Sequence, residues 1–84
     1  MITTVIVACE NASGQADFFG VRLLCTDEQY DLGEHYDSAF DIATSEGYSP
    51  SLGIDENEPA FEWFDPMKIR MLQTKEHYDM RGEQ

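Results

Sequence analysis

The carboxylates are the residues of this 84-residue chain whose number and spacing best suit a chemical role. Residues 27–65 carry 12 Asp or Glu and no Lys or Arg, and the whole chain has a formal net charge of −12. A surface that only keeps a small domain soluble usually mixes both signs, at a net charge of roughly 2 to 8 in magnitude. It also gains stability from i,i+4 pairs of Glu and Lys. The unbroken acidic stretch therefore predicts that the charge itself has a function.

Carboxylates spaced along a helix can take positions similar to those of DNA phosphates. Side chains three and four residues apart are separated by about 4.5 and 6 Å along a helix axis, and each strand of B-DNA carries one phosphate per 3.4 Å of axis. At the helical period, Glu34, Asp37 and Asp41 fall on one side, within about 60° of one another. These three acids form the expected ordered part of a binding surface, and acids in the flanking segments extend it.

Aromatic side chains beside such acids would supply binding energy, because charges mainly set the association rate and buried aromatic anchors provide most of the affinity. Tyr30 and Tyr48 lie in polar segments and are the predicted anchors, whereas Tyr36 and Trp63 are predicted to belong to the core. The predicted partner-binding residues are Asp27, Glu28, Asp31, Glu34, Asp37, Asp41, Asp55, Glu56, Glu58, Tyr30 and Tyr48.

Catalytic chemistry has little support in the residues. Cys25 and His35 could approach one another, but a nucleophilic pair also needs an oxyanion hole and an orienting third group. The chain has no nucleophile-elbow glycines, phosphate-binding glycine loop or HExxH motif. We expect a buried thiol and a surface histidine, no enzymatic activity and no cofactor.

A calcium site is also not expected. The run Asp55–Glu58 resembles the start of an EF-hand loop, but Pro59 takes the fifth position, Ala60 the position of the required Gly, and Pro66 that of the final Glu. We predict no metal site.

The elements that must position these residues begin with two strands. Residues 3–9 are β-branched and nearly all apolar, as in a strand covered on both faces. Residues 17–25 alternate so that Phe19, Val21, Leu23 and Cys25 share a face. With a loop at 11–16 the two strands form a hairpin in which Cys9 lies opposite Phe18. The two cysteines then lie at opposite ends, too far apart for a disulfide, and are predicted to be buried free thiols.

A helix is predicted over residues 34–46, ending at Gly47, with Tyr36, Ala39, Phe40 and Ala43 toward the sheet. Residues 26–33 are read as an acidic connection and residues 48–59 as a long loop.

The C-terminal part allows two interpretations. Residues 60–64 alternate as a third strand. Asp65 followed by Pro66 then favours a helix, whereas the alternation of Met67, Ile69 and Met71 with bases favours a strand.

These elements predict one α+β domain over residues 1–84. A small antiparallel sheet of three or four strands would be packed by one or two helices, in the order ββαβα or ββαββ. The first ten residues lack the basic segment of a signal peptide, and no apolar run approaches the roughly 20 residues of a membrane helix. We expect a cytoplasmic protein that binds neither nucleic acid nor membrane directly and is drawn to basic partners.

In size, charge, the strand pair TTVIVAC and DFFGVRLLC, and the acidic segment YDLGEHYDSAFDIA, the chain resembles the small acidic inhibitors of phages and mobile elements, the anti-CRISPR and antirestriction proteins. Several of these act as DNA mimics. The resemblance implies a viral protein, active in the cytoplasm of an infected bacterium, that inhibits a basic nucleic-acid-binding complex, with a CRISPR effector as the first expectation. The alternative is a small structural or adaptor protein of a phage whose charge serves solubility.

Overall fold

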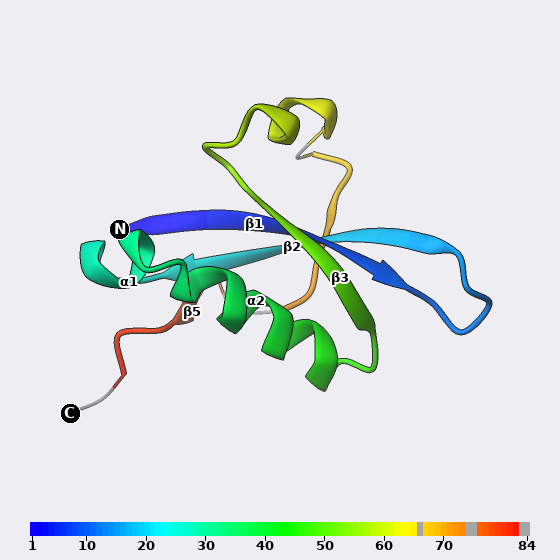
Figure 1. The fold of residues 1–84 in the computed structure, drawn as a ribbon, viewed down its shortest axis with the longest axis horizontal. Helices are drawn as coiled ribbons and strands as arrows, with labels where there is room; N and C mark the ends of the chain where they lie inside the picture. Colours follow the sequence, from blue (N-terminus) through cyan, green and yellow to red (C-terminus); the bar gives the residue numbers. More distant parts are fainter. Residues whose placement is uncertain (66, 74–75, 83–84) are drawn as a thin grey trace.

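A long antiparallel hairpin forms the centre of the fold (Figure 1). The computed structural model describes residues 1–65, 67–73 and 76–82. Strands β1 (Ile2–Glu10) and β2 (Ala16–Leu24) pair from Ile2 opposite Leu24 to Glu10 opposite Ala16. The hairpin is confirmed, but Cys9 lies opposite Asp17 and not Phe18. The reason is a shorter turn, closed by the hydrogen bond from Asn11 N to Gln15 O.

Strand β3 (Ser49–Asp55) pairs with the other side of β1, so that β1 is central in the order β3-β1-β2. The predicted loop over 48–59 is therefore wrong for most of its length. Its Ser, Pro and Gly content disfavours a strand, but pairing with β1 overrides that preference. Pro50 is tolerated because β3 lies at the edge of the sheet, where a missing N–H need not break the ladder.

Two helices follow the hairpin. Helix α1 (Asp27–Asp31) lies in the segment predicted as a connection and begins with a reciprocal cap, in which Thr26 Oγ1 accepts from Gln29 N and Gln29 Oε1 accepts from Thr26 N. Helix α2 (Glu34–Ser45) confirms the predicted helix, and Gly47 follows it with φ of 94°, a conformation that glycine adopts readily.

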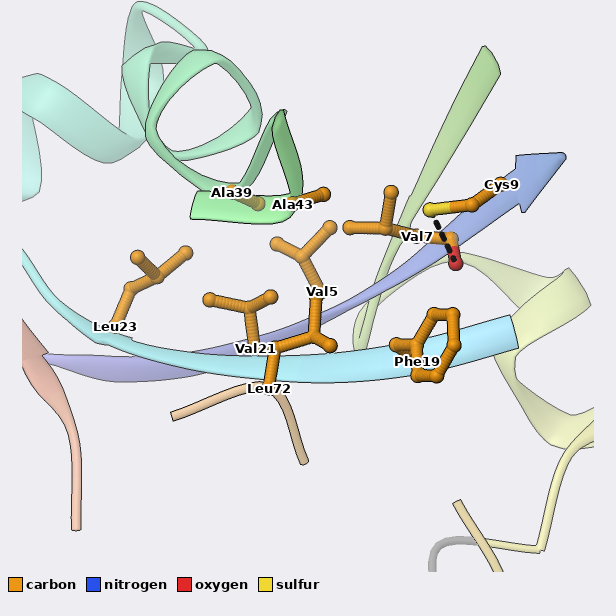
Figure 2. Close-up of a cluster of buried hydrophobic side chains, with 9 residues drawn as sticks. All are labelled: Val5, Val7, Cys9, Phe19, Val21, Leu23, Ala39, Ala43 and Leu72. Carbon is orange, nitrogen blue, oxygen red and sulfur yellow. Dashed lines mark hydrogen bonds between the residues drawn. The ribbon is translucent and has the colours of Figure 1, made fainter. Parts of the chain in front are cut away.

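The main core lies between α2 and one face of the sheet (Figure 2). Ala39 and Ala43 of α2 point toward the strand side chains, and the partly buried Tyr36 and Phe40 pack against the same cluster. This is the helix face that the sequence predicted. The buried strand residues of the cluster are Val5, Val7, Cys9, Phe19, Val21 and Leu23.

The opposite face of the sheet, called here the second face, is covered in part by residues 59–65 and 67–71. A 3-10 helix η1 (Pro59–Trp63) stands where a strand was predicted over 60–64. η1 lies on the other side of the strands from α2 (Figure 1). On this face Ile6 is fully buried, and Ile69 and Met71 approach Gly20.

The predicted C-terminal helix is wrong over the described residues 67–73 and 76–80; Pro66 lies outside them. Asp65 Oδ1 does accept from Met67 N, as a helix cap would, but the chain continues into the short strand β4 (Arg70–Met71). Packing is the reason, since Leu72 N donates to Gly20 O and the Leu72 side chain joins the core. The strand alternative is thus correct at 70–71.

Strand β5 (Tyr78–Asp79) and β4 both pair with β2 in parallel, so only the β3-β1-β2 part of the sheet is antiparallel. The α+β class is confirmed, and the order follows the ββαββ alternative with α1, η1 and a further strand added. Cys9 and Cys25 are free and buried, as predicted. Among the described residues, no helix has the length and apolar character needed to cross a membrane.

Candidate functional site

The acidic face of the molecule is formed by α1 and α2. Gly33, with φ of 76°, reverses the chain between the two helices, and Tyr36 N donates to Gly33 O to start α2. All the predicted carboxylates of these helices are exposed, and we use the name acidic face for this set: Asp27, Glu28, Asp31, Glu34, Asp37 and Asp41.

Among the residues that the structure describes, no ion pair neutralises the acidic face. The segment 27–65 has no Lys or Arg, and neither the contact of His35 with Asp55 nor the ion pair of Arg81 with Asp79 involves any of its six carboxylates. Glu34 and Asp37 lie in the first turn of α2, where the helix dipole favours negative charge. The last turn of α2 has no base. The acidic face is therefore a solvated, unpaired set of negative charges on an ordered scaffold.

The predicted binding acids Asp55, Glu56 and Glu58 lie at the end of β3 and in the tight turn that follows it. Asp55 ends β3 and is only 3% exposed, and Glu58 N donates to Asp55 O to close a tight turn. Glu58 accepts hydrogen bonds from Tyr36 Oη and from Asp55 N, so it is committed within the molecule. Glu56 is exposed, and its carboxylate accepts from Thr4 N. Asp55 is therefore too buried to extend the predicted binding surface, whereas the roles of Glu56 and Glu58 in binding stay predictions.

Asp55 belongs instead to a buried polar network under the start of α2. It accepts hydrogen bonds from Thr3 Oγ1 at 2.6 Å and from Tyr30 Oη. His35 lies beside it, with 3.8 Å between His35 Nε2 and Asp55 Oδ1. The predicted surface histidine is thus wrong: His35 is 2% exposed and its ring packs between those of Tyr30 and Tyr36, with centroids 4.5 and 4.4 Å away.

The hydrogen bonds of this network favour the protonated form of its two tyrosines. The hydrogen bond to Asp55 raises the pKa of Tyr30, and burial together with the hydrogen bond to Glu58 raises the pKa of Tyr36 far above its ordinary value. Both phenols stay protonated and donate to carboxylates. Neither ring nitrogen of His35 has a hydrogen-bond partner among the described residues.

The predicted anchors Tyr30 and Tyr48 are both half-buried and have contacts within the molecule. Tyr30 donates to Asp55 in the network, and Tyr48 packs against Phe19 with ring centroids 4.4 Å apart. Trp63, predicted as core, is 83% exposed. In the sequence, Glu62 directly before Trp63 and Asp65 two residues after it favour a polar turn over a buried strand, although Phe64 directly follows Trp63.

A pocket of about 250 Å³ lies on the second face, beside η1. Its walls are mainly apolar, with one base and one acid. The lining residues are Thr4, Ile6, Arg22, Glu56, Phe61, Ile69 and Met71. Sequence reasoning missed this pocket, because its walls come from four separate segments.

The environment of Cys25 disfavours nucleophilic chemistry at its thiol. Cys25 is buried, and burial is the main cause that raises the pKa of its thiol, which opposes formation of the nucleophilic thiolate. Across the residues that the structure describes, no group of three or more His, Cys, Asp or Glu could hold a metal ion.

No protein-family model matches the chain, and no curated protein or solved structure matches it either.

Proposed function

We propose that this protein is a non-enzymatic inhibitor that binds the basic nucleic-acid-binding cleft of a partner protein through its acidic face. The observation that carries the proposal is the set of six exposed carboxylates on α1 and α2 with no ion pair among the described residues. Carboxylates held on helices keep fixed spacings, and so they can pair with Lys and Arg side chains that otherwise contact phosphates.

The charge pattern also supports a protein partner over nucleic acid. A body with 14 acids and only Arg22 in residues 1–65 repels phosphate backbones and is steered toward basic surfaces at rates that fall with salt. The resemblance to phage inhibitors makes a CRISPR effector complex the first target to test, in the cytoplasm of an infected bacterium.

The test compares two charge reversals of equal size. Asp37→Lys with Asp41→Lys changes the acidic face, and Glu10→Lys with Glu76→Lys changes exposed acids outside it. Binding to purified CRISPR effectors, and to DNA-binding proteins retained from a bacterial lysate, is measured against salt and against a DNA duplex as competitor. We expect DNA to displace the protein, affinity to fall with salt, and the first pair to lose at least tenfold more affinity than the second.

Equal losses in both variants would mean that net charge alone attracts the partner, and retained binding in the first variant would remove the acidic face from the contact. Circular dichroism of each variant checks that the fold is intact.

A second candidate function is that of a small structural or adaptor protein of a phage. It is favoured by the apolar side chains left exposed near the second face, Trp63 at 83% and Met67 at 91%. Binding of that kind would change little with ionic strength, which separates it from the first proposal.

A further inference from the structure

The second face of the sheet is only partly covered. Of the nine large apolar side chains that are exposed among the described residues, six lie on this face or on residues 59–65 and 67–71 that cover part of it. Strand alternation places three of them on the same face as Ile6. The six are Ile2, Phe18, Leu52, Trp63, Met67 and Met71. Several exposed apolar side chains on one face are typical of an interaction site.

The pocket on this face has the size of one large aromatic side chain. An engineered apolar cavity of roughly 150 Å³ binds benzene, so a volume of about 250 Å³ can accept an indole ring. Ile6, Phe61 and Met71 supply apolar walls, and Arg22 supplies a cation that can interact with an aromatic face or a carboxylate.

Trp63 cannot fill the pocket of its own chain. In a 3-10 helix with three residues per turn, Trp63 projects about 120° away from Phe61, which lines the pocket. Its side chain is the only Trp of the protein and is left in solvent beside the exposed Glu62. A Trp that lies next to a pocket but cannot enter it could enter the same pocket of a second copy, while the Trp of that copy enters the first pocket.

We propose that two copies of the chain associate through their second faces, with Trp63 of each copy inserted into the pocket of the other. Two-fold symmetry forms this contact twice. Glu62 would accompany each Trp63 to the partner copy's pocket, where Arg22 provides the opposite charge. The pocket lining carries one base and one acid, so the contact itself adds little repulsion, while the remainder of each body of charge −12 still repels the other copy. The acidic face lies across the sheet and stays outward in both copies.

Sedimentation at increasing protein concentration, together with the emission of Trp63, tests the proposal on the full chain. We expect a dimer whose formation shifts the emission to shorter wavelength, because the indole leaves water. Added salt should strengthen the dimer by screening the repulsion. Trp63→Ala should raise the dissociation constant at least about 30-fold, as loss of an interface hot spot does, whereas Leu32→Ala, an exposed apolar residue at the end of α1, should not change it.

A charge swap tests the pairing of Glu62 with Arg22. Arg22→Glu and Glu62→Arg should each weaken the dimer, and the two together should restore it. A chain that stays monomeric at all concentrations, with solvent-exposed Trp63 emission, overturns the proposal, and the second face then serves a different partner. A dimer that keeps its affinity in Trp63→Ala also overturns it, because another surface must form the contact.

Discussion

Asp55 is a structural carboxylate. Its side chain accepts from the hydroxyls of Thr3 and Tyr30, and it lies beside the buried ring of His35. These partners come from β1, α1 and α2, so one side chain ties the end of the sheet to both helices. An acid with such partners contributes to the folded state and is withdrawn from any external partner.

Asp55→Ala should therefore destabilise the protein without a specific effect on binding. It removes the acceptor of the buried Thr3 hydroxyl, at about 1–3 kcal/mol, and that of the half-buried Tyr30 hydroxyl, which keeps its bond from Asn57 and costs less, so we expect a total loss of about 2–4 kcal/mol in urea unfolding. The control Asp41→Ala, on the exposed side of α2, should change the free energy of unfolding by no more than about 0.5 kcal/mol. Unchanged stability with weakened binding in Asp55→Ala would show instead that Asp55 contacts the partner.

The two tyrosines of the network predict how stability changes with pH. Their pKa values are raised in the folded state above the ordinary value of about 10. The protonated phenols therefore stabilise the fold below about pH 10, and this contribution is lost as the pH rises through the raised values. Unfolding measured between pH 8 and 11 should show stability falling at the alkaline end, and Tyr36→Phe should flatten that fall. An identical pH profile in Tyr36→Phe would mean that Tyr36 ionises normally.

At the scale of elements, the side chains of α2 approach β3 most closely where they contact Gly53. A Cβ built there would lie 2.9 Å from Tyr36 Cδ1 and 3.2 Å from Phe40 Cε1. Tyr36 is fixed by its hydrogen bond to Glu58 and by its contact with His35, so its ring has little freedom to move. Glycine at 53 thus sets the distance between the helix that carries the acidic face and the sheet.

Gly53→Ala should destabilise the protein by about 1–3 kcal/mol, the usual cost of extra volume in a packed site. Gly20→Ala is the matched control in β2. Its Cβ would meet Met71 Sδ at 2.8 Å, near the end of a flexible side chain, and replacing a strand glycine recovers roughly 0.5–1 kcal/mol. Thermal unfolding of both variants checks the comparison. If Gly20→Ala lowered the stability more than Gly53→Ala, the packing of Met71 against position 20 would be less adaptable than the packing of α2 against position 53.

At the scale of the whole molecule, charge opposes compactness. The chain carries −12 within a radius of gyration of 12.3 Å. The Debye length is about 30 Å at 0.01 M salt and about 10 Å at 0.1 M. At low salt every carboxylate repels every other across the molecule, and at higher salt only near neighbours do.

Stability should therefore rise with salt, opposite to the trend expected for binding through the acidic face. Between 0.01 and 0.5 M NaCl the unfolding midpoint should rise by several degrees, since about 1 kcal/mol corresponds to roughly 4–8 °C in a domain of this size. The Asp37→Lys, Asp41→Lys variant should be more stable at low salt and depend less on salt. A midpoint that fell with salt would indicate that favourable ion pairs dominate.

The local pattern of the sequence determined the parts of the fold that local physics controls. Strand alternation and β-branching predicted the hairpin of β1 and β2, and the 3.6-residue period of residues 34–46 predicted both the buried face of α2 and its exposed carboxylates. The positions of Asp37 and Asp41 on the surface follow from that period alone.

Contacts between residues that are distant in sequence control the other parts of the fold. Only the tertiary structure shows these contacts. Ser49–Asp55 is a strand because β1 offers it hydrogen bonds, and residues 70–72 leave the helical path because Gly20 and the core accept them. Asp55 is buried for the same reason. Its partners Thr3, Tyr30 and His35 lie 20 or more residues away, and no periodicity within a short segment records them.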